Sequence, residues 1–172
     1  MRAVLVGAAL AVLACQADTT SAFTPEPALA GGDRIFLEGA ARAGGVTIRV
    51  RADRVHGLYG GTFVLAYDPT LVKVAAVRAG DLTDGSGALA TTHGLPQDVA
   101  GSLTVGFVCN DEEGDGTLAE IDLDALRSGT GALAFQAPDL FNESLTRKAV
   151  DHSGTAVVGV RWQGGSLAVV QP

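Results

Sequence analysis

The 172-residue chain is poor in the residues that most often build catalytic or metal-binding sites. It holds two cysteines, three histidines and one tryptophan, and aromatic residues are only 5% of the whole. His56, His93 and His152 lie far apart, with no pair at the spacing of metal ligands. The sequence also lacks G-x-S-x-G and H-E-x-x-H patterns, and its carboxylates show no spacing that marks an acid–base pair. We therefore predict that the protein is not an enzyme.

Positive charge is scarce as well. Twelve Lys and Arg stand against nineteen Asp and Glu, so the formal net charge is −7. An acidic chain repels a phosphate backbone, which argues against nucleic acid as a partner. Hydrophobic residues nonetheless make up 47% of the sequence, enough for one packed domain of this length.

The most apolar segment is too short to span a membrane. Residues 1–14 contain twelve apolar residues and one charge, Arg2, whereas a transmembrane helix needs about 20 apolar residues. This pattern is typical of an export signal. Its end, Val12-Leu13-Ala14-Cys15, resembles the lipobox of bacterial lipoproteins. That resemblance implies a diacylglycerol on Cys15 and an exported protein anchored at the outer membrane or cell surface; the alternative is an ordinary cleaved signal.

The segment after Cys15 is rich in Thr, Ser, Ala, Pro and Gly. We predict that residues 15–32 are the lipidated cysteine and a flexible tether, and that residues 33–172 form the domain. If Cys15 carries lipid, Cys109 is a lone thiol. We interpret Cys109 as a small, half-buried residue at a strand end rather than as a catalytic nucleophile.

Hydrophobic residues beyond residue 33 recur with a period of two, which predicts strands. Val46, Ile48 and Val50 alternate with polar residues, as do Leu103, Val105 and Phe107. Twenty-three Gly and six Pro supply frequent turns. Residues 118–127 could also form an amphipathic helix, but the alternation of Glu120, Asp122 and Asp124 favours a strand there. The predicted fold is an all-β, nine-stranded antiparallel sandwich.

Several motifs resemble those of cohesin modules. They are Leu58-Tyr59-Gly60, the segment Phe63–Pro69 with its Tyr-Asp-Pro, Leu71–Val74, the turn Gly80-Asp81-Leu82 and the strand Gly114–Leu123. The resemblance covers most of residues 33–170. It implies a jelly-roll topology and a binding module, which captures a dockerin-like protein on one flat sheet face.

Alternation predicts which residues form that face. If Phe63 and Leu65 point into the core, their neighbours point outward, and the same holds around Val105. The predicted protein-binding face is therefore small and apolar, and comprises Val64, Ala66, Thr104, Gly106 and Val108. The alternative is a surface half covered by a loop or by the tether. The resemblance also implies that, on the other sheet, the strand of Arg49 and Arg51 pairs with the strand of Glu120, Asp122 and Asp124, so that their charges pair across the strands.

An acidic loop partly imitates a calcium-binding loop. Asp111, Glu113 and Asp115 stand at positions one, three and five, with Gly116 at six and Asp122 at twelve. The alternative is an acidic hairpin turn, because Asp122 on a strand would lie too far along to close a cage. No cofactor other than this calcium is expected.

With an enzyme set aside, two binding functions remain. One is a membrane-tethered module that captures a dockerin-like protein, and the other is a module that binds a polysaccharide. The second is handicapped by the aromatic count, since Trp162, Tyr59 and Tyr67 are the only Trp and Tyr available for stacking on sugars.

Overall fold

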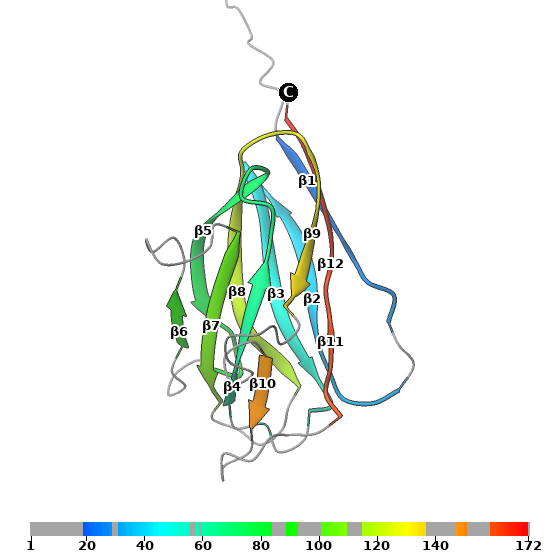
Figure 1. The fold of residues 1–172 in the computed structure, drawn as a ribbon, viewed down its shortest axis with the longest axis vertical. Helices are drawn as coiled ribbons and strands as arrows, with labels where there is room; N and C mark the ends of the chain where they lie inside the picture. The colour runs from blue at the N-terminus through cyan, green and yellow to red at the C-terminus, as the bar shows by residue number, and fades with distance from the viewer. Residues whose placement is uncertain are drawn as a thin grey trace, which may run out of the picture.

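The computed structural model describes residues 19–28, 31–55, 58, 60–83, 89–92, 101–109, 115–136, 147–150 and 159–171. These residues form twelve strands and no helix (Figure 1), which confirms the all-β prediction. The strands are β1 Thr20–Pro25, β2 Arg34–Arg42, β3 Gly45–Asp53, β4 Gly60–Ala66, β5 Val72–Ala79, β6 Leu89–Thr92, β7 Ser102–Val108, β8 Gly116–Ala125, β9 Gly129–Phe135, β10 Arg147–Val150, β11 Arg161–Gln163 and β12 Gly165–Val170. No helix in this described part of the chain is long and apolar enough to cross a membrane.

The strands form two sheets that pack face to face. One sheet has seven strands in the order β1-β12-β9-β4-β7-β6, with β10 also paired to β4; the other has five in the order β11-β2-β3-β8-β5. The sandwich is as predicted, but the described strands number twelve rather than nine, and β11 pairs with β2 in parallel rather than antiparallel.

The chain passes from one sheet to the other between its last two strands. Only Gly164 separates β11, in the five-stranded sheet, from β12, in the seven-stranded sheet. A Cβ at Gly164 would overlap the backbone carbonyl of Leu133 on β9, so the close approach of the two backbones requires glycine. This crossing ties the two sheets together covalently at one side of the sandwich.

The core lies between the sheets and follows the period of two. On β7 the buried positions are Leu103, Val105 and Phe107, each separated by a half-buried residue. Most of the core is aliphatic, with one aromatic cluster in which Phe63 contacts Phe135 edge to face at a centroid distance of 5.5 Å. The segment 116–125 is strand β8, as its acidic alternation predicted.

The structure places β1 inside the stretch expected to be a tether. β1 pairs antiparallel with β12, from Thr20 opposite Val170 to Pro25 opposite Gly165. Phe23 fills the space left by two glycines, because a Cβ at Gly39 on β2 or at Gly165 on β12 would overlap its side chain. Six residues of the expected tether are therefore a core-packed strand, and the sequence did not show this because TSAFTP carries only one large apolar residue.

Candidate binding face

The strands expected to carry the binding face are neighbours, as predicted. β4 and β7 pair antiparallel, with Thr62 opposite Gly106, Val64 opposite Thr104 and Ala66 opposite Ser102. Phe63 and Leu65 are buried in the core, so the alternate positions of β4 belong to the outer surface of the seven-stranded sheet.

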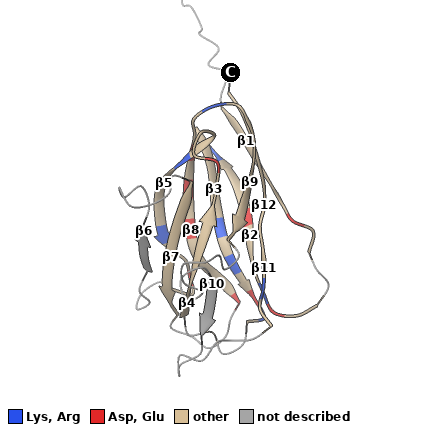
Figure 2. Ribbon diagram, viewed as in Figure 1, with Lys and Arg blue, Asp and Glu red and all other residues tan. Residues whose placement is uncertain are grey.

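This outer surface carries no charge on the strands whose side chains the structure describes. β1, β12, β9, β4 and β7 contain no Asp, Glu, Lys or Arg at all (Figure 2). Their outward residues are small or hydroxylated, and we call them the uncharged face: Ala22 and Thr24 on β1, Ser166 and Ala168 on β12, Thr130, Ala132 and Ala134 on β9, Thr62 and Ala66 on β4, and Ser102, Thr104, Gly106 and Val108 on β7. Side chains this short leave the sheet flat, and their desolvation costs little.

One of the predicted face residues is not available to a partner. Val64 keeps only 7% of its surface exposed, and the backbone N–H of Gln136 donates to its carbonyl at 3.0 Å. Ala66, Thr104, Gly106 and Val108 are half-buried at the outer surface. The prediction is therefore wrong for Val64, because part of this sheet face is covered within the protein, as the alternative interpretation allowed.

The outer surface of the five-stranded sheet is charged instead. Arg49 lies opposite Glu120, and its Nε donates to the carboxylate at 2.9 Å. Arg78 on β5 binds Asp122 at 2.5 Å and Glu120 at 3.5 Å. The predicted cross-strand pairing of charges is confirmed for Arg49 with Glu120, whereas the pairs of Arg78 were not predicted.

Arg51 departs from that ladder. The register between β3 and β8 shifts between Val50 and Arg51, so Arg51 lies opposite Thr117 rather than an acidic residue. Its Nε is buried and has no hydrogen-bond partner among the residues that the structure describes. A β-bulge of this kind moves a side chain along the partner strand and leaves no trace in the alternation of the sequence.

Asp122 is the most perturbed carboxylate among the described residues that carry a resolved shift. The hydrogen bond from Arg78 is the main cause that lowers the pKa of Asp122 to about 2, and the Thr47 hydroxyl, which donates at 2.7 Å, lowers it further. Burial opposes the shift. The carboxylate is thus held ionised by partners on two neighbouring strands.

The calcium loop finds no support in the described residues. Asp111 and Glu113 lie outside them, and Asp115 accepts a hydrogen bond from the backbone N–H of Arg54. Asp122, the residue at position twelve, is committed to β8 and to Arg78. Where the structure describes the chain, no group of three or more His, Cys, Asp and Glu side chains could hold a metal ion.

The single tryptophan is part of the core. Trp162 packs against Phe135 with ring centroids 5.0 Å apart and against Phe63 at 6.4 Å. Trp162 is half-buried and packs against the core, so the residue favoured for glycan stacking also serves the sandwich.

Cys109 follows β7 and is buried, with 3% of its surface exposed. Burial raises the pKa of its thiol to about 11, so the thiol is neutral and inert at physiological pH. Cys15 lies outside the described residues, as do Tyr59, His56, His93 and His152.

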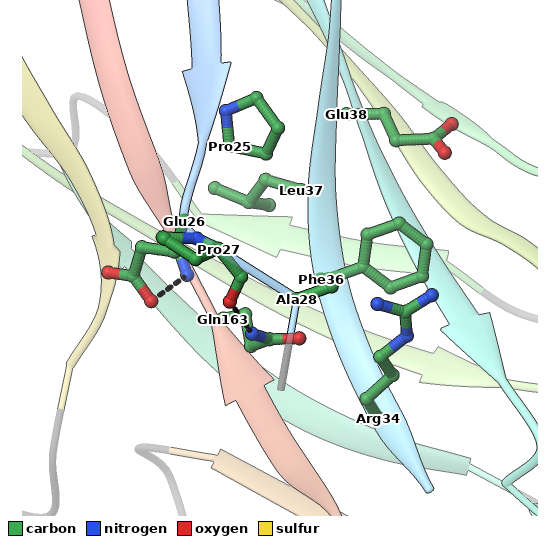
Figure 3. Close-up of a pocket in the computed structure, with 10 residues that line it drawn as sticks. Pro25, Glu26, Pro27, Ala28, Arg34, Phe36, Leu37, Glu38 and Gln163 are labelled. Atoms are coloured by element: carbon green, nitrogen blue, oxygen red, sulfur yellow. Dashed lines mark hydrogen bonds between the residues drawn. The ribbon is translucent and has the colours of Figure 1, made fainter. Parts of the chain in front are cut away.

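A cleft of about 300 Å³ lies at one edge of the sandwich, between the end of β1 and β2 (Figure 3). Several of its polar groups already have partners within the protein. Gln163 donates its amide to the carbonyl of Pro27 at 2.9 Å, and Glu26 accepts from the backbone N–H of Gly164 at 3.2 Å. At its rim, Arg34 binds Asp53 at 2.7 Å. The cleft is therefore a less suitable ligand site than the uncharged face.

Comparison with solved structures identifies the fold. The chain is similar to the second type II cohesin module from the adaptor ScaA scaffoldin of Acetivibrio cellulolyticus, with a TM-score of 0.64 and 16% identity over 80% of this chain and 91% of that one. It is similar to a non-cellulosomal cohesin from the archaeon Archaeoglobus fulgidus, with a TM-score of 0.53 and 19% identity over 69% of this chain and 76% of that one.

A third similar structure contains a bound partner. It is the complex of the cohesin Coh-OlpA with the dockerin Doc918 from Clostridium thermocellum, described as a novel type I cohesin–dockerin complex. The TM-score is 0.55, with 19% identity over 78% of this chain and 97% of that one. No family model matches the sequence, and no curated protein matches it either. The chain thus has the cohesin fold.

Proposed function

We propose that this protein is a membrane-tethered module of cohesin type, which captures a dockerin-like protein on the uncharged face of its seven-stranded sheet. The tether is the lipid on Cys15, and the protein is exported and held at the outer membrane or cell surface. The fold supports the binding role, because solved structures that share it include cohesins in complex with dockerins.

The observation that carries the proposal is the contrast in charge between the two sheet surfaces. A face built from Ala, Ser, Thr and Gly side chains can pack closely against a partner without burying an unpaired ion. The five-stranded sheet, whose charges already pair with one another, offers a partner far less surface that can be dehydrated at low cost.

The test is capture of a partner by the full chain from an extract of its source organism, followed by identification of the captured protein. We expect one protein with dockerin-type calcium-binding repeats, whose capture is lost in EDTA. Thr104→Arg should abolish capture, because it places a long cation on the uncharged face, opposite Val64 of β4. Arg49→Gln, on the opposite sheet, is the matched control and should leave capture unchanged.

Two results would contradict the binding proposal. Capture that survives Thr104→Arg but is lost with Arg49→Gln would move the site to the charged sheet. If the chain retains polysaccharide and no protein, its similarity to cohesins is limited to the fold.

The lipid anchor is tested separately. A radiolabelled fatty acid fed to cells should label the wild-type protein and not the Cys15→Ser variant.

A further inference from the structure

Two large apolar side chains are exposed in the described part of the chain, and both lie at the same end of the sandwich. Leu126 is 45% exposed in the loop from β8 to β9, and Val170 is 61% exposed at the end of β12. The backbone N–H of Gln171, next to Val170, donates to Ser128 at 2.8 Å, which brings the two segments together. Figure 1 shows this end at the top, where β1 begins and the chain ends.

The same end carries exposed cations. Arg127 and Lys73 each have 61% of their side-chain surface exposed, and both lie close to Leu126: Arg127 follows it in the chain, and the backbone N–H of Leu126 donates to the carbonyl of Leu71 at 2.8 Å, two residues before Lys73. Their ion pairs are long, at 3.7 Å from Arg127 to Asp68 and 3.6 Å from Lys73 to Asp124, although Arg127 also donates to the carbonyl and hydroxyl of Thr70. Exposed apolar residues beside long cationic side chains form the kind of surface that favours a membrane interface.

The start of β1 limits how far this end can lie from a lipid on Cys15. Thr20 is opposite Val170 in the register, so β1 begins at the end of the sandwich described above. Only residues 16–19 separate Thr20 from Cys15, and five residue steps of fully extended chain span at most about 18 Å. A tether of residues 16–32 would have allowed the domain to move far from the bilayer, whereas a connection of residues 16–19 keeps it close.

We propose that this end of the sandwich rests on the phospholipid bilayer, with Leu126 and Val170 at the headgroup level and Arg127 and Lys73 beside the lipid phosphates. The inference rests on the proposed lipid anchor at Cys15. It defines an orientation, in which the strands rise from the membrane and the uncharged face stands to the side, open to the solvent. A captured partner is then held beside the membrane rather than between the module and the lipid.

The test uses the full lipid-bearing chain in vesicles of phosphatidylethanolamine and phosphatidylglycerol. An environment-sensitive fluorophore is attached to a cysteine introduced by Leu126→Cys. The matched control is Ser166→Cys, an exposed position on β12 about 13 Å along the strand from Val170. Cys109 does not compete for the label, because it is buried and its pKa is raised to about 11.

We expect nitroxide-labelled lipids to quench the probe at residue 126 at least about twofold more than the probe at residue 166, as for a side chain at the headgroup boundary. Flotation of the labelled proteins with the vesicles is measured first. Proteins that do not float overturn the anchor, and with it the orientation. Proteins that float but are quenched equally at both positions overturn the orientation alone and leave the anchor in place.

Discussion

The two sheets of this sandwich are built from the same alternating pattern but present opposite chemistry to the solvent. Six strands of the seven-stranded sheet contain no charged residue and β10 contains Arg147 and Lys148, whereas every strand of the five-stranded sheet contains at least one. Each sheet contributes its inward residues to one common core. The difference therefore lies wholly in the outward positions, which the core does not constrain.

The comparison shows how a β-sandwich divides its surfaces. Charged cross-strand pairs keep one face soluble and contribute little to stability, since each exposed pair is worth at most about 1 kcal/mol. The uncharged face forgoes that solubility, and a surface of this kind is usually reserved for contact with a partner. Four measurements test the division, from the largest expected effect to the smallest.

A carboxylate placed at Val64 should destabilise the fold more than one placed at its cross-strand neighbour. Val64→Asp buries an unpaired charge and is expected to lower the free energy of unfolding by about 3 kcal/mol, measured by urea denaturation. Thr104→Asp, directly opposite and half-exposed, should cost less than about 1 kcal/mol. Equal losses would mean that the two positions are equally exposed in solution.

Phe23 should link the two sheets, although β1 forms its backbone pairs with only one of them. Phe23→Ala is expected to cost about 2 kcal/mol, because a half-buried ring is removed from the space above Gly39 and Gly165. Gly39→Ala alone should also destabilise, since its methyl group would overlap Phe23. The double variant should lose less stability than the sum of the two single-variant losses. A loss equal to that sum would show that the two residues do not touch.

The charged sheet should make stability depend on pH in the acid range. Because the pKa of Asp122 is lowered from 3.8 to about 2 in the folded protein, its contribution is complete above about pH 4 and is lost as the pH falls towards 2. The expected loss is about 1 kcal/mol, after allowance for the solvent-exposed Arg78. Asp122→Asn should be less stable than the wild type at about pH 5, and this gap should close near pH 2. A stability difference that does not change with pH would contradict the lowered pKa of Asp122.

The weakest effect is expected for the pair of Arg49 with Glu120. A double-mutant cycle with alanine at both positions should give a coupling of about 0.5 kcal/mol, measured by urea denaturation and reduced by added salt. A coupling above about 1 kcal/mol would place this pair in a less hydrated setting than its half-exposed position implies.

Much of the architecture could be predicted from local pattern. The alternation at Leu103, Val105 and Phe107 placed β7 and its buried side, and the acidic alternation in residues 120–124 distinguished a strand from a helix. Both features depend on residues two positions apart, which any reader of the sequence can see. The pairing of Arg49 with Glu120 joins distant segments, and it was expected from the resemblance to cohesin modules rather than from a local pattern.

Other features depend on contacts between distant segments. The strand β1 is set by Phe23 meeting Gly39 and Gly165, and the burial of Val64 depends on what covers the sheet. The bulge that isolates Arg51 and the crossing at Gly164 are equally invisible in a local pattern.

The sequence by itself determined the all-β class, the inward side of each strong strand and the lack of charged residues in the segments that form β1, β4, β7, β9 and β12. Only the tertiary structure decided that Thr20–Pro25 pairs with the last strand, which end of the sandwich lies nearest to Cys15 along the chain, and which face residues remain exposed. The reason is physical: alternation expresses the two-residue geometry of a single strand, whereas coverage and proximity arise only when segments far apart in the chain pack together.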